Sequence, residues 1–231
     1  MELLLLSSSR TPAGYLTDYL AAIRAFAGGI RAAHFVPYAA VSLPWDEYCS
    51  RVGEALAAAD LRVEFVDSVD DLRRAELIVV GGGNTFQLLR ECRRRGFLPV
   101  IQDRVKAGMR YLGWSAGANL ACPTIKTTND MPIVDPGSLD ALGLVGFQIN
   151  PHYLSVALPG HHGETRDERL AEFARVNPKV PVIGLPEGAS LRVSNSTVEL
   201  LGPYPAVHFI GEKPPRRLMP GKLPTLSGDI A

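Results

Sequence analysis

The sequence is poor in cysteine and carries no excess of charge. Its 231 residues include only three cysteines, which are widely spaced: Cys49, Cys92 and Cys122. An odd, sparse set is neither a disulfide framework nor a zinc pattern, and it predicts reduced thiols in a cytoplasmic protein. Lys plus Arg and Asp plus Glu both total 24, so the formal net charge is zero. This balance favours neither nucleic acid nor an acidic membrane surface as a partner.

Long apolar runs and a basic leader are missing as well. The apolar start of the chain, residues 1–6, is too short to cross a membrane and follows no basic segment. We therefore expect no membrane association and interpret this stretch as a first core strand. The chain length fits one large domain more easily than two, and 46% hydrophobic residues are typical of a globular protein. The sequence leaves the oligomeric state open, a homodimer included.

Apolar segments with strand character alternate with segments of helical periodicity over the first half of the chain. This alternation predicts an α/β fold with a mostly parallel sheet and helices on both faces. The expected strands are 2–6, 32–36, 62–66, 76–80 and 109–112, and the expected helices are 15–26, 45–59, 69–74, 85–95 and 99–107. Further strands are expected at 146–150 and 180–185, and short antiparallel strands at the sheet edge at 191–193, 198–200 and 207–210. Residues 1–211 should form a single catalytic domain, and the proline-rich residues 212–231 a loosely ordered tail.

The most informative motif is Gly113-Trp114-Ser115-Ala116-Gly117, between a predicted strand and a short predicted helix. Gly-x-Ser-x-Gly in this context is typical of a nucleophile elbow, in which a strained turn exposes the serine and small neighbours let a substrate approach. The alternative is an ordinary turn in which Ser115 caps the helix. The five residues alone do not decide between the two interpretations.

Four landmarks fall at carboxyl ends of predicted strands, where sites gather in open α/β sheets: Gly81–Asn84, Ser115, His152 and Glu187. A serine nucleophile also requires two backbone donors for an oxyanion. The N–H groups of Ala116 and Gly83 are the candidates. A phosphate-binding loop at Gly81–Asn84 is disfavoured because no Lys-Ser/Thr follows it.

Among the five histidines, His152 is the preferred general base because it follows a strand and a proline. His34 and His208 lie inside apolar strands and are interpreted as packed residues. His161 and His162 lie in a polar loop and are candidates for substrate contact, although a solvated loop is the simpler interpretation.

The carboxylate that orients the base is ambiguous. Asp130 lies in a polar run, and its simpler interpretation is a turn residue. Glu187 lies in Leu185-Pro186-Glu187-Gly188, where it is equally consistent with a loop carboxylate. The order Ser, Asp, His matches that of hydrolases, but order does not define a triad.

Several long motifs resemble the peptidase E group of aspartyl dipeptidases in the S51 serine peptidase family. The similarity extends from Met1 to about Gly202 and is carried by residues 79–89, 113–119, 127–136 and 148–152. The resemblance implies a flavodoxin-like sheet related to class I glutamine amidotransferases. It also implies cleavage of dipeptides with an N-terminal aspartate, without a cofactor or metal.

Transferred by motif, the resemblance makes Ser115 the nucleophile and His152 the base, with Asp130 slightly preferred over Glu187 as the third member. Two alternatives stay open: a cyanophycinase-like or β-aspartyl peptide hydrolase on the same fold, and a non-catalytic binding module. The first would share the triad, so only substrates separate it from the dipeptidase.

An aspartate side chain in the substrate pocket is an anion and requires a local cation. Arg166 is the candidate, because it lies in the family-like stretch Gly163–Arg166 and because a guanidinium binds a carboxylate with two parallel hydrogen bonds. Its alternative role is an ion pair with Glu164 or Asp167 on a solvated helix. Asn84 and His161 are further candidates for substrate contact.

Overall fold

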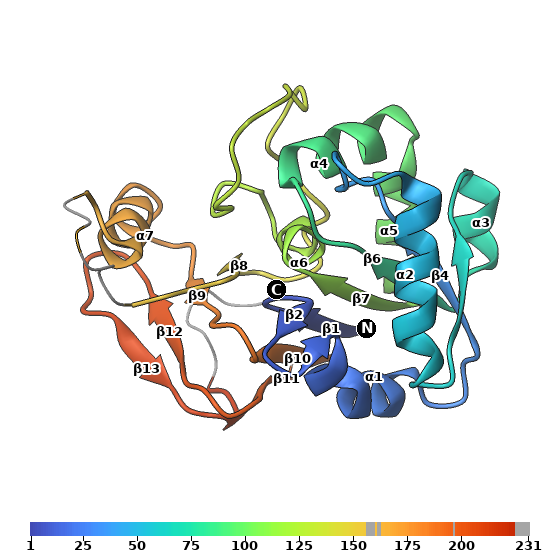
Figure 1. Cartoon of the computed structure of the whole chain (residues 1–231). Coiled ribbons are helices and arrows are strands. Elements are labelled where there is room, and N and C mark those ends of the chain that lie inside the picture. The colour runs from blue at the N-terminus through green and yellow to red at the C-terminus, as the bar shows by residue number, and fades with distance from the viewer. Residues whose placement is uncertain (156–159, 161–162, 196, 225–231) are drawn as a thin grey trace.

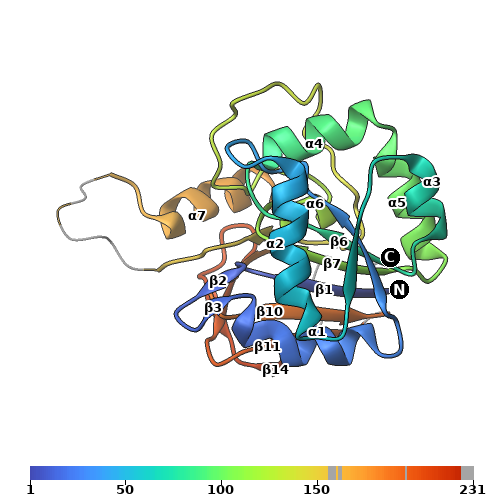
Figure 2. The same ribbon diagram turned by 45° about the vertical axis from the view of Figure 1, so that its right-hand side comes forward.

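The computed structural model describes residues 1–155, 160, 163–195 and 197–224. Its main element is an eight-stranded mixed sheet with the order β14-β11-β10-β1-β7-β6-β4-β5. Strands β1, β7, β6, β4 and β5 run parallel, and β10, β11 and β14 continue the sheet antiparallel. Figure 2 shows β11, β10, β1, β7 and β6 side by side in this order. The predicted α/β architecture with antiparallel strands at one edge is confirmed.

The strands of this sheet are β1 Glu2–Leu6, β4 Ala32–Val36, β5 Arg62–Phe65, β6 Leu77–Val80, β7 Arg110–Trp114, β10 Ser190–Ser194, β11 Thr197–Leu201 and β14 Gly221–Lys222. The helices are α1 Leu20–Ala27, α2 Trp45–Ala57, α3 Val69–Arg74, α4 Thr85–Arg94, α5 Phe97–Lys106, α6 Ala116–Ala121 and α7 Arg166–Val176. A β2–β3 hairpin (Arg10–Thr11 and Gly14–Tyr15) and the 3-10 helix η1 (Thr17–Tyr19) replace the first part of the helix expected at 15–26.

Apolar side chains cover both faces of the parallel strands, as a doubly covered sheet requires. In β1, Leu3 and Leu5 join the core under α3–α6, whereas Leu4 and Leu6 join the core under α1 and α2. All four leucines are fully buried. The central strands are therefore fixed between two layers of helix, and their carboxyl ends meet at one edge of the sheet.

A second sheet, which the sequence did not predict, lies beside the first with the order β13-β12-β9-β8. Its strands are β8 Gln148–Asn150, β9 Val182–Gly184, β12 Ala206–Phe209 and β13 Arg216–Leu218. Helix α7 packs on it, and Figure 1 shows this unit on the left, opposite α2–α5. The expectation that residues 207–210 lie at the edge of the main sheet is therefore wrong. Their alternation predicts a strand correctly but does not say which sheet the strand joins.

The expectation of a loosely ordered tail does not fit residues 212–224, and residues 225–231 lie outside the described residues. Strand β14 pairs with β11, and β13 pairs with β12. Leu218 and Leu223 are 2% and 7% exposed, so this segment contributes to the core. Two leucines in a proline-rich segment only weakly indicate strands in the sequence. In the structure they are buried and help to hold β13 against β12 and β14 against β11. None of the described helices has the length and apolar character of a membrane span.

His34 in β4 generates a prediction about stability. His34 is 5% exposed, as expected for a packed histidine, and its Nε2 lies 3.5 Å from a carboxylate oxygen of Glu64. Burial lowers the pKa of His34, and this outweighs the opposing effect of Glu64. The unfolded chain therefore binds more protons than the folded one as pH falls below about 6.5, the ordinary histidine pKa, and stability decreases there.

We expect His34→Gln to reduce the loss of unfolding free energy between about pH 7.5 and pH 5.5. Urea denaturation of the variant and the parent protein at both pH values measures this difference. An identical pH dependence in the two proteins would contradict the assignment.

Candidate active site

Ser115 occupies a strained turn between β7 and α6. Its φ is +52°, in the left-handed region that residues other than glycine rarely adopt. Gly117 makes the turn feasible, because a Cβ at this position would lie 2.2 Å from the carbonyl oxygen of Val80. Such a turn exposes the serine hydroxyl above the sheet, as a nucleophile elbow does.

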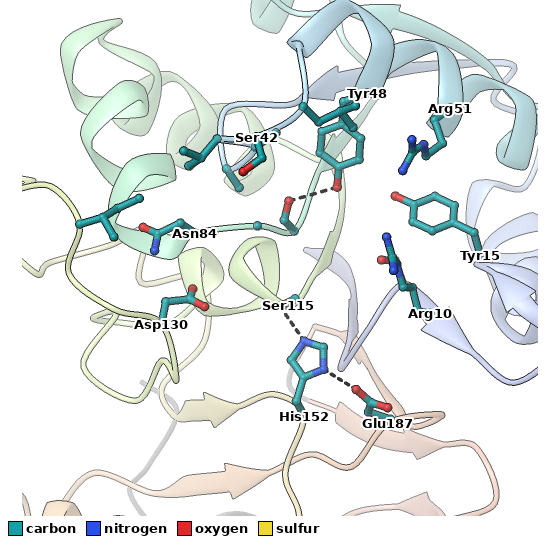
Figure 3. Close-up of a pocket in the computed structure, with 18 residues that line it drawn as sticks. Arg10, Tyr15, Ser42, Tyr48, Arg51, Asn84, Ser115, Asp130, His152 and Glu187 are labelled. Atoms are coloured by element: carbon teal, nitrogen blue, oxygen red, sulfur yellow. Dashed lines mark hydrogen bonds and ion pairs between the residues drawn. The ribbon is translucent and has the colours of Figure 1, made fainter.

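Ser115, His152 and Glu187 form a continuous hydrogen-bonded chain (Figure 3). Ser115 Oγ lies 2.8 Å from His152 Nε2, and His152 Nδ1 lies 2.6 Å from Glu187 Oε1. Because an ionised carboxylate only accepts, Nδ1 carries the proton, and Nε2 is left to accept the serine O–H. This tautomer is the one in which a histidine acts as general base for a serine.

The base and its carboxylate come from the second sheet, not from the sheet that carries the serine. His152 follows β8 and Glu187 follows β9, and these two strands are parallel neighbours. Their following loops therefore lie side by side. His152 has a φ of +53°, so both Ser115 and His152 are held in strained backbone at the point where the sheets meet.

Ser7, at the end of β1, ties the histidine to the main sheet. The N–H of His152 donates to Ser7 Oγ over 2.8 Å, and Ser7 Oγ donates to the carbonyl of Leu185 over 2.8 Å. Ser7 is fully buried. In sequence, one serine in the run Ser7-Ser8-Ser9 carries no signal that distinguishes it from its neighbours.

Ser7→Ala should lower both stability and turnover. The change leaves the His152 N–H without its partner, which costs about 1–3 kcal/mol for a buried group, whereas the Leu185 carbonyl still accepts from the N–H of Tyr153. Loss of the anchor also lets the imidazole move relative to Ser115, so kcat should fall more than KM rises. Ser138→Ala, at an exposed turn, is the matched control. Unchanged kcat in a less stable Ser7→Ala protein would show that the anchor is only structural.

Asp130 does not contact the histidine in the structure. Its Oδ2 accepts from the N–H and the hydroxyl of Thr85, over 2.8 and 2.5 Å, and from the hydroxyl of Thr128 over 3.1 Å. It therefore sits at the N-terminus of α4, where a carboxylate is favoured by the helix dipole. The slight preference for Asp130 over Glu187 does not match this geometry, because helix capping competes for the same carboxylate.

Glu187→Gln and Asp130→Asn should have different kinetic effects. Removing the charge that faces His152 destabilises the imidazolium, so we expect Glu187→Gln to lower kcat by about 10²- to 10³-fold. The expected loss is smaller than for a buried triad carboxylate, because the Glu187 side chain is 60% exposed. Asp130→Asn retains the cap and should act mainly on KM. Steady-state kinetics with one substrate compare the two, and a larger loss of kcat in Asp130→Asn would contradict the assignment.

Two backbone N–H groups beside the serine are available to bind an oxyanion. Among the described residues, neither Gly83 nor Ala116 donates its N–H to an acceptor outside its own element. Ala116 is the first residue of α6, where no intrahelical acceptor exists. Gly83 has a φ of +139°, and a Cβ there would lie 2.2 Å from the carbonyl oxygen of Ala39. Only glycine fits this position.

A hydrogen-bonded bridge holds the Gly83 turn against the serine turn. The Nε1–H of Trp114 donates to the hydroxyl of Tyr48 over 3.2 Å, and Tyr48 donates to the carbonyl of Gly82 over 3.1 Å. The Trp114 ring also stacks on Phe35 with 5.9 Å between centroids. The two N–H groups are therefore fixed relative to each other before any substrate binds.

The hydrogen-bonded chain opens into a cavity of about 720 Å³ at the carboxyl ends of the parallel strands. Asn84 and Asp130 line one end of it, and Arg10, Tyr15 and Arg51 line the opposite end (Figure 3). The sequence does not indicate that arginines line this end of the cavity, which we call the arginine end (Arg10, Tyr15 and Arg51). Arg10 lies in the unpredicted β2–β3 hairpin and Arg51 is one of many charged residues on α2, so neither stands out in sequence.

The predicted substrate contacts differ in their placement. Asn84 lines the cavity, but its side chain accepts from the N–H of Gln87 over 3.0 Å and donates to the carbonyl of Met131 over 2.8 Å. Arg166 lines a neighbouring cavity of about 590 Å³, which shares Asp130 with the first. Among the described residues Arg166 forms no ion pair, so the alternative pairing with Glu164 or Asp167 is not found. His161 lies outside the described residues.

The cysteines do not take part in this site. Cys92 and Cys122 are buried, and burial raises the pKa of each thiol to about 12. They therefore stay neutral and unreactive near pH 7. No cluster of His, Cys, Asp and Glu that could hold a metal occurs in the described ranges.

Comparison with known proteins identifies the family of this chain. The family model described as "Peptidase family S51" matches residues 3–201. The proteins named peptidase E from Salmonella newport and Salmonella typhimurium are each 52% identical to this chain over 208 residues, which cover 88% of this chain and 91% of theirs.

Two solved structures share the fold at low sequence identity. A peptidase from an acI-B1 Actinobacterium has a TM-score of 0.66 and 18% identity, with 96% of each chain covered. A Listeria monocytogenes protein has a TM-score of 0.67 and 24% identity, covering 88% of this chain and 98% of its own. The match of the family model over most of the chain, together with the identity to the Salmonella proteins, shows that this chain belongs to peptidase family S51.

Proposed function

We propose that this protein is a serine dipeptidase that hydrolyses dipeptides with an N-terminal aspartate through an acyl-enzyme on Ser115. The observation that carries the proposal is the hydrogen-bonded chain Ser115–His152–Glu187, with distances of 2.8 and 2.6 Å, in the lining of a cavity of about 720 Å³. Relatives named peptidase E at 52% identity support the peptidase chemistry. The preference for aspartate rests on the family resemblance and on the charges described below.

In the acylation step, Ser115 Oγ attacks the carbonyl carbon of the peptide bond while His152 Nε2 takes the hydroxyl proton. The carbonyl oxygen becomes an oxyanion, and the N–H groups of Gly83 and Ala116 stabilise it. His152 then donates the proton to the leaving nitrogen. The C–N bond breaks, the second amino acid leaves as a free amine, and an aspartyl ester remains on Ser115.

In the deacylation step, His152 Nε2 takes a proton from a water molecule, and the oxygen of that water attacks the ester carbonyl. Collapse of the second oxyanion breaks the C–O bond and returns the proton to Ser115. Glu187 stabilises the imidazolium that forms in both steps. Every proposed step uses groups of the chain and water.

The aspartate residue of the substrate carries an ammonium group and a side-chain carboxylate, so it requires charges of both signs. Asp130 lines the cavity near Ser115 and supplies a negative charge for the ammonium. Arg166 is proposed to bind the side-chain carboxylate from the adjoining cavity, which meets the first at Asp130. Burial lowers the pKa of Arg166, and a desolvated guanidinium without an ion pair favours a bound carboxylate.

A cytoplasmic location is part of the proposal. Cys49, Cys92 and Cys122 are all free in the structure, which is consistent with a reducing compartment.

A panel of Asp-Leu, Glu-Leu, Asn-Leu and β-Asp-Leu tests the proposal. We expect hydrolysis of Asp-Leu in preference to the other three, and Ser115→Ala should lower kcat by about 10⁴-fold or more without a change in fold. Preference for β-Asp-Leu would favour a β-aspartyl hydrolase. A wild-type protein that hydrolyses none of the panel and is not labelled by a fluorophosphonate at Ser115 would favour a non-catalytic module.

A further inference from the structure

We propose that Arg10 and Arg51, together with the hydroxyl of Tyr15, bind the free α-carboxylate of the residue that leaves. This inference deepens the proposed function and rests on it. It assigns the arginine end of the active-site cavity to the C-terminus of a dipeptide, and it makes these residues the ones that select dipeptides over longer peptides.

The two arginines lie at the same end of the active-site cavity. Both line the cavity that contains Ser115, at the end opposite Asn84 and Asp130 (Figure 3). Arg51 comes from α2, and Arg10 comes from β2, where it pairs across the hairpin with Tyr15. Two cations from separate elements therefore meet at one end of the cavity.

Arg10 and Arg51 have few other groups in the structure to bind. Within the described ranges Arg10 takes part in no ion pair, and Arg51 reaches only Glu47, one turn away on α2, at 3.6 Å. The Arg51 and Glu47 side chains are 45% and 58% exposed, so this pair contributes little to stability. An arginine pair without a strong internal partner in a small cavity suits an anionic ligand.

Tyr15 supplies a neutral donor at the same place. Its hydroxyl is buried beside the side chains of Tyr48 and Ser9, but it forms no hydrogen bond of good geometry with a described residue. Its ring meets Trp114 edge-on at 6.5 Å. Burial raises the pKa of Tyr15 above its usual value, so the hydroxyl keeps its proton. A buried O–H without an acceptor costs free energy, and a carboxylate oxygen would satisfy it.

The charges of the cavity match a dipeptide in one orientation. A dipeptide zwitterion has its ammonium and its terminal carboxylate at opposite ends, and the cavity has Asp130 at one end and the arginines at the other. Ser115 lies between them, where the peptide carbonyl has to be. In a longer peptide the same position is occupied by an uncharged amide, which cannot replace the carboxylate.

The test compares Asp-Leu with Asp-Leu-amide, which lacks only the terminal negative charge. We expect the wild-type protein to have a kcat/KM for Asp-Leu at least about 10-fold above that for the amide. Arg51→Gln and Arg10→Gln should each lower kcat/KM for Asp-Leu by about 10- to 100-fold and change the value for the amide by less than about twofold. The double variant should show no preference between the two substrates.

Two further variants separate substrate binding from folding and from recognition of the aspartate. Arg166→Met should lower kcat/KM for acid and amide by the same factor, because both substrates carry the aspartate side chain. Arg73→Gln, an exposed arginine on α3 paired with Asp70, should leave both values unchanged. Arg51→Lys should restore part of the acid preference, because the charge is kept while the paired geometry is lost.

Each remaining outcome has a definite meaning. Equal losses for acid and amide in Arg51→Gln and Arg10→Gln would overturn the inference and assign the arginines to the aspartate side chain or to the fold. A wild-type protein that hydrolyses Asp-Leu and Asp-Leu-amide with equal kcat/KM would overturn the inference but not the proposed function. A wild-type protein inactive on every Asp-X substrate would overturn the proposed function, and the inference with it.

Discussion

The active site depends on a hydrogen-bonded chain that crosses from one sheet to another. Ser115 belongs to the main sheet, while His152 and Glu187 follow two strands of the smaller sheet. Proton transfer needs donor and acceptor within a few tenths of an ångström of their working distance. The relative position of the two sheets must therefore be closely fixed. One apolar core contributes to this, because Ile149 and Ile183 of the smaller sheet belong to the same buried cluster as Leu3 and Leu5 of the main sheet.

Ser7 meets much of this requirement, because one buried hydroxyl joins the backbone of His152 to the loop that leads to Glu187. The same region contains two residues with positive φ, Ser115 and His152. Strained backbone persists only where surrounding contacts determine it fully. Rigid buried strands, with aromatic side chains around Trp114, provide those contacts, so the core holds the described site residues in place before a substrate binds.

The sequence predicted more of the main sheet than of the site. Buried runs such as Leu3–Leu6 have a strong local signal. The Gly-x-Ser-x-Gly turn makes Ser115 a candidate because its glycine neighbours are constrained by space, although the motif alone does not decide its role. The second sheet was missed because three-residue strands carry no information about their partners. The preference for Asp130 over Glu187 rests on the family resemblance. The sequence itself does not separate the two loop carboxylates, whereas the structure places Glu187 against the imidazole and Asp130 against Thr85. Arg10 and Arg51 were missed because an arginine near a site looks the same in sequence as one on a solvated surface.

The hydrogen bonds of Ser7, which join the two sheets, affect how this protein loses its activity. Each sheet keeps its own ladder of backbone hydrogen bonds, whereas the joint between them consists of a shared apolar core and buried side-chain hydrogen bonds such as those of Ser7 and Asn119. A slight opening of that joint separates Ser115 from His152 while leaving helices and strands intact. The protein can thus lose its activity while its fold is retained. In a damaged or warmed sample, the fraction of active molecules therefore reports a small displacement between the two sheets more sensitively than a measurement of secondary structure does.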